Sequence, residues 1–360
     1  MKILRPIAIL SSCLLLTASA VAQISLAPPT AQTPPAAGKP ASKPKAKPAA
    51  AAKKPIAPAA TPEPAATPAP TATVTPAPAP DDPNVDLVYG AYQRGQYKTA
   101  FDLATRRAQD NGDPKAMTML GELYANAMGI KRDYAKAADW YKRAADGGDR
   151  EAMFALAMLR LSGRGGPVNR EEAAKLLASS AKLGNPKAAY NLALLYLDGQ
   201  TLPQDLKRAA ELFRVAADAG NPEAQYALAT FYKEGTGVPK DIEKAVRLLQ
   251  AASLADNVDA EVEYAIALYN GTGTPKNEAA AVALLRKAAK QDSPIAQNRL
   301  ARVLVTGQGA PMDKIEGLKW HIVAKTAGKG DPMLDEAFAD LSPEDRARVE
   351  AAARKWLGTK

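Results

Sequence analysis

The chain has 360 residues, of which 47% are hydrophobic but only 6% are aromatic, a composition that suits helices packed through small residues better than a compact α/β enzyme. Its formal net charge is +9, yet residues 1–80 hold eight basic residues and one acidic residue, so the remainder is nearly neutral and has no basic face sized for nucleic acid. Cys13 and His321 are the only cysteine and histidine, which argues against disulfides, zinc clusters and Cys–His catalysis.

Residues 1–22 have the three parts of a secretory signal peptide. Lys2 and Arg5 precede an apolar run, Ile7–Leu16, and small residues follow up to Ala22. Because the run is too short to span a bilayer, we expect cleavage after Ala22, no transmembrane segment in the mature chain, and export, most simply to the periplasm. Secretion is one alternative. A lipid anchor at Cys13 is another, although the apolar run continues beyond that cysteine.

Residues 23–84 consist almost wholly of Pro, Ala, Thr, Lys and Ser. Such a segment has too little apolar bulk to offset its chain entropy, so the sequence predicts a disordered Pro/Ala/Lys-rich linker biased toward polyproline II. It has two interpretations. It is a spacer, or it is a basic stalk that binds an acidic envelope polymer such as the cell wall.

From residue 85 onward the sequence repeats at an interval of 36 residues. A glycine or aspartate ends one helix, a polar residue caps the next helix, and a proline often occupies its first turn. The N-caps expected at these junctions are Asp113, Asp149, Asn185, Asn221, Asn257 and Ser293. A second series with the same interval caps the partner helices and comprises Asp133, Asn169, Asp205, Asp241, Asn277 and Asp313. The pattern predicts six helix pairs over residues 112–330.

Large and small apolar residues recur at fixed positions within each pair. The large residues are Leu120, Leu156, Leu192, Leu228, Tyr264 and Leu300. A glycine or alanine follows each of them directly, where helices must approach closely. Residues 85–111 form a shorter helix pair at one end, and residues 331–360 form capping helices at the other. The fold class expected is all-α, a right-handed α-α superhelical solenoid.

The segments Asn221–Tyr232 and Gly235–Asp241 resemble the Sel-one-like repeat (SLR), a relative of the tetratricopeptide repeat, and Trp140–Ala145 matches the second half of that pattern. Residues 85–111 resemble a tetratricopeptide unit. Two residues depart from the pattern. Arg160 stands where other units have tyrosine, and Thr201 replaces a turn glycine. The resemblance implies adaptor or regulatory roles, and some exported family members modulate sensor proteins or contact host proteins.

Catalytic motifs are not found in this sequence. His321 would need a nucleophile or a carboxylate as a partner, and spacing indicates none, so we interpret it as a partly buried packing residue. Gly235-Thr236-Gly237 lacks a preceding strand and the lysine of a phosphate-binding loop, which makes it a turn. We therefore expect no catalytic residue, no metal ligand and no cofactor. An enzyme would need a deep pocket where at least two titratable groups converge.

A surface is the stronger candidate for function. First helices usually line the concave side of a helix-pair solenoid, and helical phase predicts which of their side chains face the groove. The candidate partner-binding residues are Phe154, Met158, Tyr190, Leu194, Leu197, Tyr226, Ile266, Tyr269 and Arg302. They form either an exposed stripe for a helix or an extended peptide, or a core between repeats. The sequence thus predicts an envelope scaffold that binds a protein or peptide, with a structural or wall-associated protein as the alternative.

Overall fold

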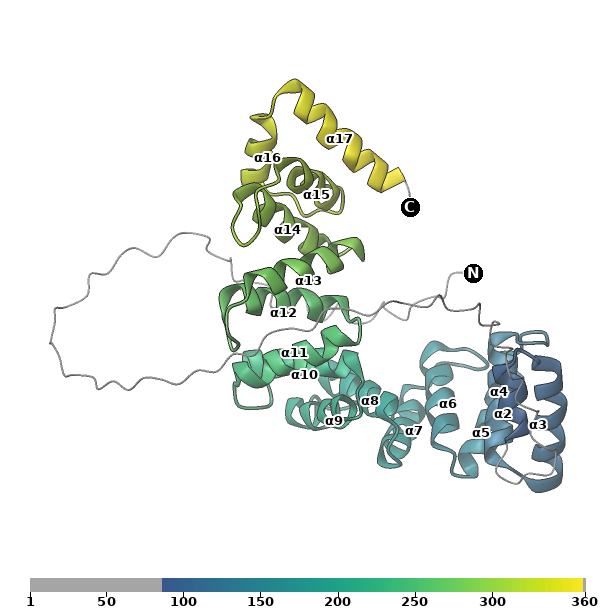
Figure 1. Cartoon of the computed structure of the whole chain (residues 1–360). Helices are drawn as coiled ribbons and strands as arrows, with labels where there is room; N and C mark the ends of the chain where they lie inside the picture. Colours follow the sequence, from purple (N-terminus) through teal and green to yellow (C-terminus); the bar gives the residue numbers. More distant parts are fainter. Residues whose placement is uncertain (1–85, 359–360) are drawn as a thin grey trace, which may run out of the picture. The chain divides into compact units, whose positions relative to one another are not determined.

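The computed structural model describes residues 86–358. The predicted signal peptide, the linker and the alternative anchor at Cys13 lie outside the described residues. Within residues 86–358 the chain forms sixteen helices and no strand. From α2 to α15, each helix packs mainly on the helices that precede and follow it in the chain, as Figure 1 shows for α4 to α15. The prediction of an all-α solenoid of helix pairs is confirmed.

The six central pairs each consist of a first helix, here called the A helix, and a second helix, the B helix. The A helices are α4 (Pro114–Asn126), α6 (Arg150–Ser162), α8 (Pro186–Asp198), α10 (Pro222–Glu234), α12 (Val258–Asn270) and α14 (Pro294–Thr306). The B helices are α5 (Tyr134–Asp146), α7 (Arg170–Lys182), α9 (Leu206–Asp218), α11 (Ile242–Leu254), α13 (Glu278–Lys290) and α15 (Lys314–Thr326). The flanking helices are α2 (Leu87–Gln93), α3 (Tyr97–Asn111), α16 (Pro332–Ala339) and α17 (Pro343–Gly358).

Side-chain caps begin all twelve central helices at the predicted residues. In the fourth pair, α10 and α11, the Asn221 carboxamide oxygen accepts from the Ala224 amide at 2.7 Å, and the Asp241 carboxylate accepts from the Lys244 amide at 2.9 Å. Each cap satisfies an amide that the helix leaves unpaired and contributes about 1 kcal/mol. Five A helices end on a glycine in the left-handed conformation. The α4 helix ends instead on Ala127, at φ 58°.

Small residues let neighbouring helices approach closely. A Cβ on Gly121 would lie 2.5 Å from the Tyr141 ring, so only glycine leaves room for that tyrosine between α4 and α5. The corresponding alanines from Ala157 to Ala301 are at most 1% exposed. The predicted large residues are buried too, except that Tyr264 is only half-buried. Buried residues form five clusters that succeed one another along the described chain, which is the core of a stack rather than of a globule.

The last helices close the C-terminal end of the stack. The α17 helix packs on α15, where the Trp356 and Trp320 rings meet edge to face at 5.0 Å. The Lys319 ammonium lies 3.9 Å from the centre of the Trp320 ring, so its charge faces an aromatic surface. Leu334 and Val349, from α16 and α17, are fully buried. These contacts cover apolar groups that an unfinished solenoid would expose.

Gly237 and Gly220 both have a positive φ, but only Gly237 lies close to another helix. Alanine substitutions at the two positions therefore distinguish the cost of backbone strain from the cost of a steric clash. Gly237 has φ 65°, and a Cβ there would lie 2.3 Å from the Leu206 carbonyl oxygen, whereas Gly220 has φ 84° and nothing within 4 Å. Gly220→Ala should lower the free energy of unfolding by about 1 kcal/mol through backbone strain alone. Gly237→Ala should lower it by about 3 kcal/mol, since the clash adds to the strain. Urea unfolding followed by circular dichroism measures both, and equal losses would mean that this turn does not pack on α9.

Candidate partner-binding site

The nine predicted groove residues lie on the A helices α6 to α14 and are all half-buried. We call them the A-helix face. Most of its apolar members pack against the buried clusters and still expose part of their surface. Met158 alone among the apolar members lies outside those clusters. The face therefore combines the two interpretations that the sequence allows, because most of its apolar side chains give one side to the core and the other to solvent.

Two tyrosines form the centre of the A-helix face. The Tyr190 ring lies 5.7 Å from the ring of Phe213, a fully buried residue of α9. Burial raises the pKa of Tyr190 to about 12, with a smaller contribution from the charge of Glu223. Tyr226 packs against the cluster around Leu249. Burial is also the main cause of its raised pKa. Both rings are thus held in place by the core, which fixes the position of their exposed edges.

Acidic groups surround Tyr226. The charges of Glu263, Asp259 and Glu234 all raise the pKa of its phenol, in that order after burial. Glu263 pairs with the Lys233 ammonium at 3.0 Å. Asp259 is different, because no cation among residues 86–358 lies within ion-pair distance of it, and restricted hydration followed by the charge of Glu263 raises the pKa of its carboxyl. Glu263 is thus compensated by a neighbouring cation, whereas the Asp259 carboxylate has only the first turn of α12 to stabilise its charge.

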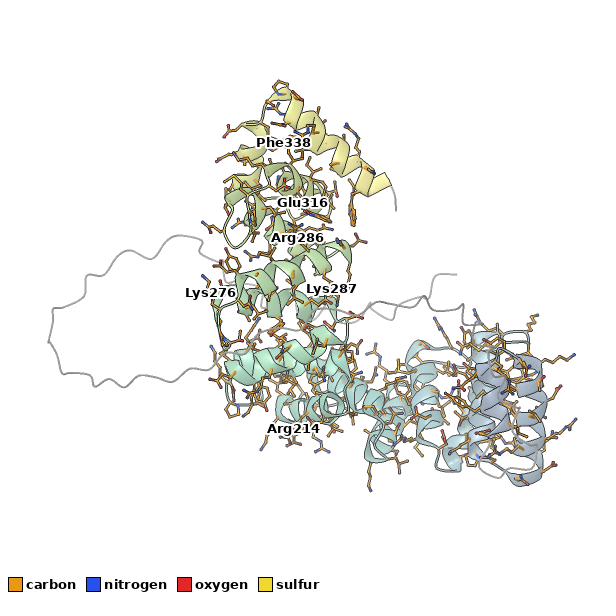
Figure 2. All side chains as sticks on the ribbon, viewed as in Figure 1. Arg214, Lys276, Arg286, Lys287, Glu316 and Phe338 are labelled. Carbon is orange, nitrogen blue, oxygen red and sulfur yellow. The ribbon has the colours of Figure 1, made fainter. Side chains whose placement is uncertain are left out.

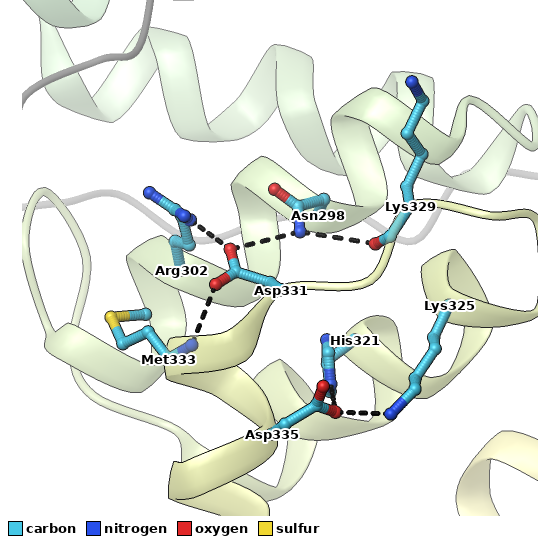
Figure 3. A network of polar contacts seen from close by, with 8 residues as sticks. All are labelled: Asn298, Arg302, His321, Lys325, Lys329, Asp331, Met333 and Asp335. Carbon is cyan, nitrogen blue, oxygen red and sulfur yellow. Dashed lines mark hydrogen bonds and ion pairs between the residues drawn. The ribbon is translucent and has the colours of Figure 1, made fainter.

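Arg302, the only charged residue of the face, is already bonded within the chain. Its Nε donates to the carboxylate of Asp331, the N-cap of α16, which is only 3% exposed (Figure 3). Asn298 Nδ2 donates to the same carboxylate at 3.3 Å, and so does the Met333 amide at 3.2 Å. Desolvation would raise the pKa of Asp331, but the hydrogen bond and charge of Arg302 outweigh it, and the pKa is lowered. Arg302 thereby joins α14 to α16.

His321 is fully buried, at 1% exposure, and its Nε2 lies 2.8 Å from Asp335 Oδ1 (Figure 3). Lys325 Nζ donates to the same oxygen at 2.7 Å, and these two partners, Lys325 before His321, lower the pKa of Asp335. The inference that spacing indicates no carboxylate partner was therefore wrong. Two extra residues before α16 shift Asp335 out of the 36-residue register. It stands at the fourth position of its helix, where polar residues of earlier A helices also reach a neighbouring helix, namely Gln225, Glu261 and Gln297.

Further ion pairs join different helices of the stack. Glu261 is fully buried and lies 2.6 Å from Lys287 Nζ, which also reaches Asp256. Arg286 of α13 and Glu316 of α15 are 2.6 Å apart, and Figure 2 labels both. These pairs satisfy charges between helices. They stabilise the register of the repeats.

A hollow of about 190 Å³ lies where α9 and α10 meet the turn at Val238. It is smaller than the roughly 300–1,000 Å³ of ordinary ligand pockets. Among residues 86–358, no group of three or more His, Cys, Asp or Glu side chains is arranged to hold a metal ion. None of the helices in that range combines the length and apolar content needed to cross a bilayer.

The fold defines an α-solenoid of 36-residue helix pairs related to the tetratricopeptide class. The sequence profile of the Sel1 repeat matches six consecutive segments, residues 114–149, 150–185, 186–221, 222–257, 258–293 and 294–329. Since these segments cover more than half of the chain, it belongs to the Sel1 repeat family. Proteins of this family are generally scaffolds for protein–protein interaction rather than enzymes.

Solved structures agree with this assignment. A Sel1 repeat protein from Oxalobacter formigenes is 26% identical, with a TM-score of 0.59 over 67% of this chain and 98% of that protein. The c5321 protein, a protective antigen of uropathogenic Escherichia coli strains with an SLR fold, is 23% identical and shows the fold alone, with a TM-score of 0.54 over 75% of this chain and 67% of that protein. Comparison with curated proteins finds no significant match.

The network at Asp331 makes a prediction about stability. Asp331→Ala removes both a cap and the partner of Arg302, and should lower the free energy of unfolding by about 3 kcal/mol, the low end for a buried pair because Arg302 remains 29% exposed. Asp313→Ala, which removes a cap only, should cost about 1 kcal/mol.

The pH dependence follows from the lowered pKa of Asp331. A carboxyl whose pKa is lower when folded stabilises the protein above its unfolded pKa of about 3.9 and loses that contribution as pH falls further. The difference between the native chain and Asp331→Ala should therefore shrink below about pH 4. A difference that stays constant in urea titrations from pH 7 to pH 3 would contradict the ion pair.

Proposed function

We propose that this protein is a non-catalytic scaffold or regulator of the bacterial cell envelope that binds a partner protein or peptide through its A-helix face. The observation that carries the proposal is the half-buried state of that face. Eight of its nine residues are apolar or aromatic, and seven of these eight pack against the buried clusters yet leave surface for a ligand. Side chains that are ordered before binding lose little conformational entropy when a partner arrives.

The arrangement of the residues along the A-helix face favours a helix or an extended peptide as the ligand. Apolar side chains follow one another from α6 to α12, in the manner of surfaces that receive a partner's apolar stripe. The signal-peptide pattern of residues 1–22 supports a periplasmic location. The N-terminal residue of the protein recovered from cells tests that location, because cleavage after Ala22 leaves Gln23 first and a lipid-anchored form begins at Cys13.

A matched pair of substitutions tests the binding face. Met158 lies on the face but outside the buried clusters, so Met158→Glu should leave the melting temperature unchanged and raise the Kd for the partner about tenfold. Val215, on α9, is an exposed apolar residue away from the face, and Val215→Glu is the control. Affinity capture from envelope extracts identifies the partner, and titration of that partner gives each Kd.

Equal Kd values for Met158→Glu and the unmodified protein would remove the A-helix face from the proposal. The same holds if Val215→Glu, rather than Met158→Glu, weakens binding.

A further inference from the structure

The hollow between α9, α10 and the turn at Val238 lies away from the A-helix face. Leu228 and Tyr232 line it from α10, and they follow Tyr226 by two and six residues. At 3.6 residues per turn these positions are about 200° and 240° around the helix from Tyr226. The hollow and the A-helix face are therefore separate surfaces on different sides of α10.

The floor of the hollow is apolar and its wall is held in place. Ala210 and Leu228 are buried there, and Val238 is half-buried. The turn that carries Val238 packs closely on α9, because a Cβ on Gly237 would lie 2.3 Å from the Leu206 carbonyl oxygen. A site whose wall is fixed before binding loses little conformational entropy when a ligand arrives.

Two cations line the hollow from α9, and both are exposed. They are Lys207 and Arg214, the second of which is labelled in Figure 2. Within residues 86–358 neither side chain makes a hydrogen bond, an ion pair or a ring contact. Because they are seven residues apart, or about two turns, they lie on the same side of α9.

Two acidic groups near these cations already have basic partners of their own. Glu211 also lines the hollow, but its carboxylate pairs with the Arg208 guanidinium at 3.0 Å. The Lys244 ammonium lies 5.5 Å from the centre of the Tyr232 ring and pairs with Asp241 at 3.0 Å. The two unpaired cations of α9 therefore give the hollow a positive charge.

This pair of cations is specific to α9 among the six B helices. Lys207 and Arg214 occupy its second and ninth positions. The same positions hold Ala135 and Lys142 in α5, Glu171 and Ala178 in α7, Glu243 and Gln250 in α11, Ala279 and Arg286 in α13, and Ile315 and Ile322 in α15. No other B helix has two basic residues there, so stacking of the repeats does not require them.

We infer that this hollow is a second binding site, which takes a glutamate side chain from an acidic segment of a partner protein. A cavity of about 150 Å³ holds a group the size of benzene, so 190 Å³ admits one such side chain but not a whole ligand molecule. The methylene groups of the glutamate cover the apolar floor, which a phosphate ion has no stem to do. Its carboxylate accepts from the Arg214 guanidinium, whose donors match two oxygens, and the Lys207 ammonium adds charge.

The site goes beyond the proposed function, because it does not use the A-helix face. Since the two surfaces lie on different sides of α10, a ligand in the hollow leaves Tyr226 accessible. The scaffold thereby gains a contact that selects for negative charge, whereas the A-helix face selects for apolar groups.

Titration of the full chain with a defined peptide tests the site. The probe is Gly-Ser-Glu-Ser-Gly with an acetylated N-terminus and an amidated C-terminus, so the glutamate carries its only charge, and its twin has glutamine instead. The glutamate peptide should shift the methyl NMR signals of Leu228 and Val238 and bind about five- to tenfold more tightly than its twin. Equal affinities of the two peptides, or no shift at about 10 mM peptide, overturn the inference.

Neutral variants should change the affinity in opposite directions. Lys207→Gln combined with Arg214→Gln removes both cations and should weaken binding of the glutamate peptide about five- to tenfold. Glu211→Gln removes the acidic side chain that lines the hollow and should strengthen binding about two- to threefold. An effect on folding alone would not produce opposite signs. Weaker binding by Glu211→Gln would contradict the site.

A matched control separates local charge from net charge. Lys98 and Arg106 are likewise an exposed lysine and an exposed arginine on one helix, α3. Lys98→Gln combined with Arg106→Gln should leave both the peptide affinity and the melting temperature unchanged. If this control weakens binding as much as the loss of Lys207 and Arg214, the hollow is not the site. Met158→Glu should not alter the peptide affinity, so failure of the hollow and failure of the A-helix face are separate results.

Discussion

The structure depends on one constraint, which is that a 13-residue helix cannot stabilise itself. Helices of this length are marginal in water, and their stability comes from packing an apolar side on neighbours. Close approach at Gly121, Ala157 and their equivalents makes that packing possible with few aromatic residues. Caps then fix where each helix begins, so the same geometry recurs every 36 residues. A solenoid is the arrangement in which every helix is covered by its neighbours in the chain.

This constraint also explains why the A-helix face is half-buried. A residue such as Tyr190 lies at the edge of the contact between helices, so one side of its ring meets Phe213 and the other meets solvent. The face is consequently rigid and partly apolar without being a pocket. Acidic residues lie beside both central tyrosines of the face, Glu223 beside Tyr190 and Glu263 beside Tyr226. Side chains that the core already holds in place would lose little conformational entropy on binding a ligand.

The sequence predicted the features that repeat and missed those that occur once. Asn221 and Asp241 are caps by residue type and interval, so their roles could be recognised from the sequence alone. Asp331 and Asp335 could not be placed, since two inserted residues shift them from the 36-residue interval and their partners come from other helices. Helical phase chose the A-helix residues, but exposure depends on how far adjacent units are rotated, which the sequence does not state.

Removal of one internal unit tests the central claim most directly. Deleting residues 222–257 joins Asn221 to Val258, so that an asparagine still caps α12. If every unit is supported only by its neighbours, the shortened chain should fold with the same ellipticity per residue, and its urea m-value should fall in proportion to the surface removed. Loss of cooperative unfolding, or collapse of the helical signal, would show that the helices share a core that one unit cannot leave.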